Sequence, residues 1–167
     1  MAEVLFKGAP MHTRGSLPAV GTKAPEFKLT TGDLRDVGLS EYKGKRKILS
    51  VVHSLDTGTC AVSTRRFNTE ATKLPNTVVL VISNDLPFAQ KRFCEAEKIA
   101  NVVPLSQMRN RDFGKTYGME ITDGPIAGLL ARSIVVIDES DKVVYTEQVQ
   151  ETTKEPDYEK ALAAARK

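Results

Sequence analysis

Two nearly continuous apolar runs stand out in the first half of the chain. They cover residues 47–55 (KILSVVHSL) and 77–83 (TVVLVIS), and charged or polar residues bound both of them. Short runs that are rich in β-branched residues are typical of strands buried on both faces of a sheet. We therefore expect two buried strands here, the first of them in the centre of the sheet.

A segment with helical periodicity follows the first run. Phe67, Ala71 and Leu74 have the spacing of one helical face, and the preceding residues 56–59 (DTGT) are candidate caps. This pattern predicts a helix over residues 60–74, with Cys60 in its first turn.

A second helix is expected after the other run, with Asn84 and Asp85 as its caps. Cys94 lies beside the predicted apolar stripe of this helix. The stripe consists of Leu86, Ala89, Phe93, Ala96 and Ala100.

The remaining signals before residue 130 are shorter. Residues 3–7 and 11–14 predict a hairpin around Gly8-Ala9-Pro10, and residues 26–29 predict a short strand before a turn at 31–33. Residues 101–128 look irregular, apart from a short helix at 111–117.

The end of the chain predicts two strands, at 133–138 and 143–149, joined by a hairpin turn, and then a helix at 158–164. Two strand–helix units, a strand hairpin and a terminal helix describe an α/β protein with a central mixed sheet flanked by helices. This order fits a thioredoxin-like fold. The length of 167 residues and the absence of a linker predict a single domain over residues 1–167.

Composition argues against several classes of function. Lys and Arg number 24 against 21 Asp and Glu, and a net charge of +3 does not favour nucleic-acid binding. No apolar run approaches the roughly 18 residues of a membrane span. The N-terminal segment lacks the apolar stretch of a secretory signal, so we expect a cytoplasmic protein that does not bind membranes.

Metal and cofactor sites have no support either. The two cysteines and two histidines are scattered singly and lack zinc-site spacing. Nucleotide-binding and serine-hydrolase motifs are absent. We expect no metal and no cofactor.

Cys60 has the strongest chemical signal. A cysteine in the first turn of a helix is close to unpaired N–H groups and the positive end of the helix dipole, and both favour thiolate over thiol. An isolated cysteine is more often a small buried hydrophobe. The residues around Cys60 decide between these interpretations.

Residues 56–68 (DTGTCAVSTRRFN) resemble the active-site block of bacterial thiol peroxidases, the atypical two-cysteine branch of the peroxiredoxins. The resemblance extends over nearly the whole chain and includes the N-terminal hairpin. The other matching blocks are residues 83–89 (SNDLPFA), 92–94 (RFC), 109–118 and 130–133 (LARS).

The resemblance implies a role for each of four residues. Cys60 matches the peroxidatic cysteine, whose thiolate attacks a hydroperoxide and becomes a sulfenic acid. Thr57 matches a threonine whose hydroxyl contacts the peroxide, and it is also a candidate N-cap. Arg132 matches an arginine that holds the thiolate and polarises the O–O bond. Cys94 matches the resolving cysteine, which forms an intramolecular disulfide with Cys60.

The resemblance also implies that hydrogen peroxide and organic hydroperoxides are the substrates, that thioredoxin is the reductant and that the working form is a homodimer. Because the two cysteines are on different predicted helices, we expect the first turn of the Cys60 helix to unwind before the disulfide forms.

His53 departs from the family pattern, which has proline seven residues before the peroxidatic cysteine. The imidazole is either a neutral, hydrogen-bonded wall residue or a group that titrates near neutral pH and acts on the thiolate. We expect the first, because a charged ring without a partner is costly to bury.

Two other functions remain open at this point. The first is a non-catalytic redox-sensing or interaction module on the same fold. The second is a thiol–disulfide oxidoreductase, which the absence of a C-x-x-C pair disfavours.

Overall fold

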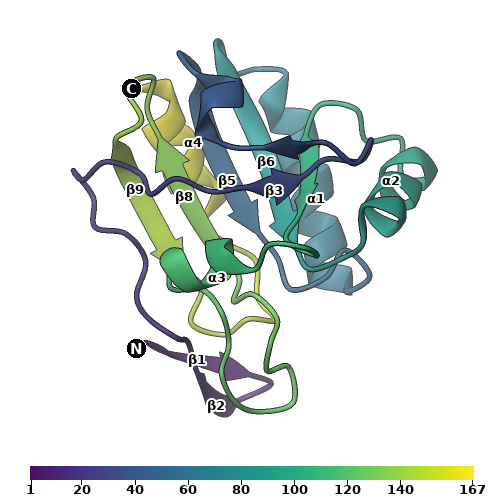
Figure 1. Cartoon of the computed structure of the whole chain (residues 1–167), viewed down its shortest axis with the longest axis vertical. Helices are drawn as coiled ribbons and strands as arrows, with labels where there is room; N and C mark the ends of the chain where they lie inside the picture. Colours follow the sequence, from purple (N-terminus) through teal and green to yellow (C-terminus); the bar gives the residue numbers. More distant parts are fainter.

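The computed structural model describes all residues 1–167 and is built around a seven-stranded sheet with the order β4-β3-β7-β6-β5-β8-β9. The two buried runs form β5 (Arg46–Val51) and β6 (Thr77–Ser83), which pair in parallel. On its other side β5 pairs antiparallel with β8 (Ser133–Ile137), and β8 pairs antiparallel with β9 (Val143–Gln148). The sheet is therefore mixed and β5 is a central strand, as predicted (Figure 1).

Helices cover both faces of this sheet. They are α1 (Gly58–Ala71), α2 (Pro87–Ala96), α3 (Asp112–Thr116), α4 (Tyr158–Arg166) and the 3₁₀ helix η1 (Leu39–Tyr42). None of them has the length and apolar character needed to cross a membrane.

Neighbouring side chains of the central strands enter two different cores, because successive residues of a strand point to opposite faces. Ile48 of β5 and Val79 of β6 pack in one core with the buried residues of α1 and α4. Leu49 and Leu80 pack in the other core with residues of α3, η1 and β3. In Figure 1, α1 and α4 lie behind the sheet and α3 lies in front of it. The alternation explains why both runs are apolar at nearly every position.

The N-terminal hairpin forms, but its turn differs from the prediction. β1 (Glu3–Phe6) and β2 (Ala9–His12) are joined by Lys7 and Gly8, with φ angles of +52° and +82°. Two left-handed residues make the primed turn that matches the twist of a hairpin. Ala9 and Pro10, which we placed in the turn, are paired residues of β2.

Three short strands were predicted wrongly or missed. The strand expected at 26–29 begins only at its last position, as β3 (Leu29–Thr30), and pairs with the unpredicted β4 (Asp36–Val37). β7 (Val103–Ser106) lies in the region that looked irregular. It contains Pro104, which argues against a strand. The proline is tolerated because β7 pairs with β3 only at Ser106.

The second helix also departs from the prediction. α2 begins at Pro87 after the N-cap Leu86, and no side chain caps it, so Asn84 and Asp85 are not its caps. Its buried residues are Pro87 and Gln90, whereas Leu86 of the predicted stripe is exposed. The amide of Gln90 is accommodated because it donates to the Ser83 hydroxyl and the Leu105 carbonyl.

Candidate active site

The sulfur of Cys60 lies at the end of the sheet where β5 stops. The chain leaves β5 at Val51, crosses a loop and begins α1 at Gly58, so Cys60 is in the first helical turn and fully buried. Thr57 is the N-cap residue. The local fold therefore places the thiol beside the unpaired N–H groups of a helix N-terminus, as the sequence predicts.

Arg132 reaches the same sulfur from a distant part of the chain. It directly precedes β8, and because β8 is antiparallel to β5, the start of one strand lies beside the end of the other, with Ser133 opposite Val51. The buried guanidinium donates from Nη2 to Cys60 Sγ at 3.0 Å and from Nε to the Thr152 carbonyl at 2.9 Å. Its third nitrogen, Nη1, has no hydrogen-bond partner within the protein.

A cavity of about 270 Å³ opens beside the start of α1. His53, Thr57 and Thr59 line it together with Phe6 and Lys7 of the N-terminal hairpin. The hairpin lies beyond the end of the main sheet in Figure 1. The Thr57 hydroxyl donates to the Ser54 carbonyl at 3.1 Å.

The surroundings of Cys60 favour its thiolate. Burial raises the pKa of the thiol, but the neighbouring imidazole of His53, the charge of Arg132 and the hydroxyl of Thr57 together lower that pKa to about 6. An ordinary cysteine has a pKa of about 8.5. Cys60 is therefore mostly ionised at neutral pH, which is the state that attacks electrophiles.

Known proteins share this arrangement of elements. The Redoxin family model matches residues 19–162. A peroxiredoxin-like protein from Aquifex aeolicus superposes with a TM-score of 0.93 at 39% identity, covering 99% of this chain and 96% of its own. The thiol peroxidases of Mycobacterium bovis and Mycobacterium tuberculosis are each 51% identical over 164 residues, which is 98% of this chain and 98% of theirs. The chain belongs to the thiol peroxidases of the redoxin family. It is a peroxiredoxin enzyme with a thioredoxin-like fold, as the sequence analysis predicts.

Cys94 of this thiol peroxidase packs against the same core as Cys60 but makes no hydrogen bond to the Cys60 sulfur. Both cysteines are free thiols. Cys94 is half-buried in α2 and lines a different cavity of about 540 Å³, which shares no residue with the one beside Cys60. Burial and the neighbouring Glu95 raise the pKa of the Cys94 thiol. The structure thus brings Cys60, Thr57 and Arg132 together, and it places Cys94 on another helix at the edge of the same core.

Asp85, which we expected to cap the second helix, instead holds the loop before α1. Its carboxylate accepts hydrogen bonds from the Ser54 hydroxyl and the Leu55 N–H, both at 2.8 Å, and from the Ser83 hydroxyl at 2.7 Å. The position of Asp85, two residues beyond a buried parallel strand, is the sequence signal that could have indicated this role.

Glu151 fastens the hairpin over the site. Its carboxylate accepts from the N–H groups of Lys7 and Gly8 at 3.0 and 2.9 Å and from the Thr153 hydroxyl at 2.8 Å. These hydrogen bonds outweigh desolvation and lower the pKa of Glu151 to about 2. No local motif marks this residue, because the hairpin turn that it holds is 143 to 144 positions away in the sequence.

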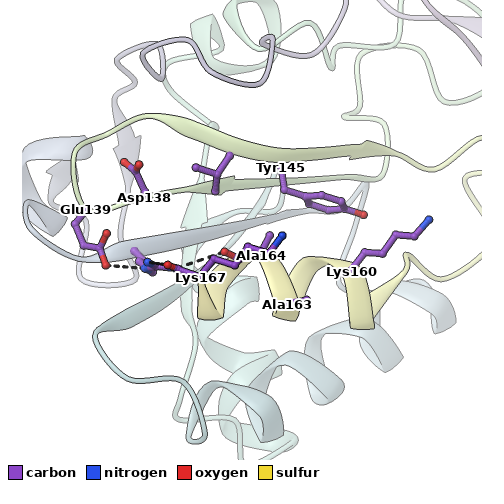
Figure 2. A pocket seen from close by; sticks show the side chains of 9 residues that line it. Asp138, Glu139, Tyr145, Lys160, Ala163, Ala164 and Lys167 are labelled. Atoms are coloured by element: carbon purple, nitrogen blue, oxygen red, sulfur yellow. Dashed lines mark hydrogen bonds and ion pairs between the residues drawn. The ribbon is translucent and has the colours of Figure 1, made fainter.

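Another pocket, of about 420 Å³, lies between the β8–β9 turn and α4 (Figure 2). Arg46 in its wall donates to Glu139 at 2.6 Å and to the Ala165 carbonyl at 2.9 Å, so this guanidinium holds the end of α4. The pocket has no cysteine and shares no residue with the Cys60 site. We therefore place the chemistry at Cys60 and not here.

Proposed function

We propose that this peroxiredoxin reduces hydrogen peroxide and organic hydroperoxides, with Cys60 as the attacking thiolate. The sulfur displaces the alkoxide from the O–O bond, so that Cys60 becomes a sulfenic acid and the hydroperoxide becomes an alcohol after protonation. The observation that carries this proposal is the 3.0 Å hydrogen bond from Arg132 Nη2 to the buried Cys60 sulfur, whose pKa is lowered to about 6.

Two further groups fit the proposed substrate. Arg132 Nη1 is a buried donor without a partner, and a peroxide oxygen is an acceptor that can use it. Thr57 borders the cavity, and its hydroxyl oxygen, whose hydrogen is donated to the Ser54 carbonyl, can accept a hydrogen bond from the O–H of a hydroperoxide. We propose that these groups hold the O–O bond in line with the sulfur.

We propose that Cys94 then attacks the Cys60 sulfenic acid, releases water and forms an intramolecular disulfide. Since Cys60 is fully buried in the first turn of α1 and Cys94 lines a cavity beside α2, this step requires the first turn of α1 to unwind locally. An external dithiol, which we propose to be thioredoxin, then reduces the disulfide. A cycle through free thiols suits a reducing compartment such as the cytoplasm.

Peroxide turnover coupled to thioredoxin, thioredoxin reductase and NADPH tests this function. We expect continuous NADPH oxidation after addition of hydrogen peroxide or an organic hydroperoxide, and none after the thiols have been blocked by alkylation. Oxidation that stops after one stoichiometric turnover would contradict the proposal and indicate a redox-sensing module instead.

Cys94→Ser separates the two thiol steps. The variant should still consume an equimolar amount of peroxide at the parent rate, because Cys94 is in α2 and makes no hydrogen bond to the Cys60 sulfur. It should lose turnover with thioredoxin and hold a Cys60 sulfenic acid that dimedone traps. Parent-like turnover with thioredoxin would show that Cys94 serves only in packing.

We propose that the working form is a homodimer, with the start of α2 in the interface. Leu86 and Phe88 are 54% and 64% exposed there, an unusual position for two large apolar side chains. Phe88→Glu should convert the dimer into a monomer in sedimentation velocity experiments, whereas the control Val20→Glu, at another exposed apolar residue, should not. A Phe88→Glu protein that sediments as a dimer would place the interface elsewhere.

A further inference from the structure

His53 is buried beside Cys60 with an unused polar atom. Only four buried side-chain nitrogen or oxygen atoms lack a hydrogen-bond partner within the protein, and two of them, His53 Nδ1 and Arg132 Nη1, are at the Cys60 site. His53 is 5% exposed. Our expectation of a hydrogen-bonded wall residue is therefore wrong for Nδ1, which has no partner. Burying such a nitrogen without a partner costs free energy.

The position of the ring gives it access to both reacting groups. His53 lines the cavity beside the start of α1 together with Thr57, the cavity into which a peroxide would enter. Its interaction with the sulfur also contributes to the lowered pKa of Cys60, although Nδ1 makes no regular hydrogen bond in this resting geometry. The imidazole is thus close to the thiol and to the substrate cavity at once.

No nearby carboxylate pairs with His53, so the Cys60 thiolate is the anion that can balance a positive charge on the imidazole. The carboxylates nearby are occupied, because Asp85 accepts from the Ser54–Leu55 loop and Ser83, and Glu151 accepts from the hairpin turn and Thr153. No ion pair or hydrogen bond joins either carboxylate to His53. The other groups on the surrounding elements are Lys7 of the hairpin turn, Arg132 before β8 and Tyr158 of α4.

We propose that His53 is the proton partner of Cys60. The imidazole accepts the thiol proton as the thiolate forms, and the resulting imidazolium gives that proton to the oxygen that leaves the peroxide. The thiolate forms the S–O bond as the O–O bond breaks, so thiol and hydroperoxide become sulfenic acid and alcohol with no proton taken from solvent. The proposal rests on the proposed role of Cys60 as the attacking sulfur.

In this arrangement a charged imidazole at position 53 has a partner, so the cost of burying an unpaired charge does not arise. Proton transfer from Cys60 to His53 creates a thiolate and an imidazolium side by side, so the new charge is paired as it forms. Arg132 stabilises the thiolate through the hydrogen bond from its Nη2 to the sulfur, but it exchanges no proton, because a guanidinium stays protonated. His53 therefore supplies a function that Arg132 cannot.

The test compares the parent protein with His53→Asn and His53→Pro. Asn keeps a polar group without a titrating one, and Pro is compatible with the loop because no hydrogen bond from the His53 main-chain N–H is present. His12→Asn is the matched control, since His12 is the other histidine and pairs with Asp123 on the surface. Circular dichroism verifies that each variant is folded.

The first readout is the rate of Cys60 alkylation by iodoacetamide from about pH 4 to 9, a range that brackets ordinary imidazole and thiol ionisations. Mass spectrometry of the Cys60 peptide distinguishes alkylation of Cys60 from alkylation of Cys94. We expect a midpoint of about 6 in the parent and in His12→Asn. In both His53 variants the midpoint should move up by about one pH unit. An unchanged midpoint in both would overturn the proposal.

The second readout is the rate of Cys60 oxidation by hydrogen peroxide at neutral pH, divided by the thiolate fraction from the first. Loss of a proton donor to the leaving oxygen should lower this normalised rate by about a hundredfold in both variants. A normalised rate equal to the parent's would overturn the proton-return step. Alkylation does not depend on peroxidase turnover, so failure of the proposed function would leave the first readout interpretable.

Discussion

Cys60→Ser should reduce peroxide turnover to that of a blank without protein. A serine hydroxyl is not ionised at neutral pH and cannot form a sulfenic acid, so the variant has no nucleophile for the O–O bond. Removal of the nucleophile from other covalent enzymes costs roughly 10⁴-fold or more in rate. The measurement is thioredoxin-coupled NADPH oxidation with hydrogen peroxide.

The matched control for this prediction is Cys94→Ser, which makes the same chemical change in the other cysteine. It should keep the first, stoichiometric consumption of peroxide that Cys60→Ser loses. Turnover above the blank in Cys60→Ser would show that the attacking group is not Cys60.

Arg132→Lys should lower kcat/KM for hydroperoxides by roughly tenfold to a hundredfold. Lysine keeps the charge, but one ammonium group cannot replace the planar fork that donates to both the sulfur and the Thr152 carbonyl and still leaves Nη1 free. Hydrogen bonds to charged groups are each worth about 1.5–3 kcal/mol, which corresponds to this loss of rate. Steady-state kinetics over a range of hydroperoxide concentrations measures it.

Arg65→Lys is the control for the arginine change, because Arg65 is on α1 but its side chain is 46% exposed and pairs with Glu97 on the surface. It should leave kcat/KM unchanged. If Arg132→Lys also stays within about twofold of the parent, the guanidinium does not act on the reacting atoms.

The central strands were predictable because their burial on both faces leaves a strong local signal. β6 matches its apolar run at both ends, and β8 ends one residue before its predicted end. β5 stops at Val51, so residues 52–55 of the first run were wrongly included in the strand; they belong to the loop before α1. β3 and β4 are two residues long and leave no periodic pattern. β7 was missed because Pro104 argues against a strand unless the pairing on that side is known.

The buried face of α2 shows a different limit of sequence analysis. The helix buries Gln90, whose amide is satisfied by Ser83 and Leu105, and it exposes Leu86 and Phe88. Hydrophobic periodicity assumes that polar residues face solvent. It fails where a buried amide finds partners on neighbouring strands and where large apolar residues are exposed.

The residues of the candidate site also differ in how far a local sequence pattern could predict them. Thr57 and Cys60 are close in sequence, and the pattern of a strand followed by a helix placed them correctly at a helix start. Arg132 reaches Cys60 across 72 positions in the sequence, and only the family resemblance indicated it. The unpaired nitrogen of His53 depends on the positions of surrounding side chains, so no sequence pattern could show it.

Peptide mapping after a single oxidation tests the role of Cys60 most directly. The reduced protein receives an equimolar amount of hydrogen peroxide without any reductant, and its peptides are then analysed by mass spectrometry under non-reducing conditions. We predict one disulfide-linked pair of peptides, which contain Cys60 and Cys94. Peroxide consumption that leaves the Cys60 peptide as a free thiol would contradict the assignment of Cys60 as the sulfur that attacks peroxide.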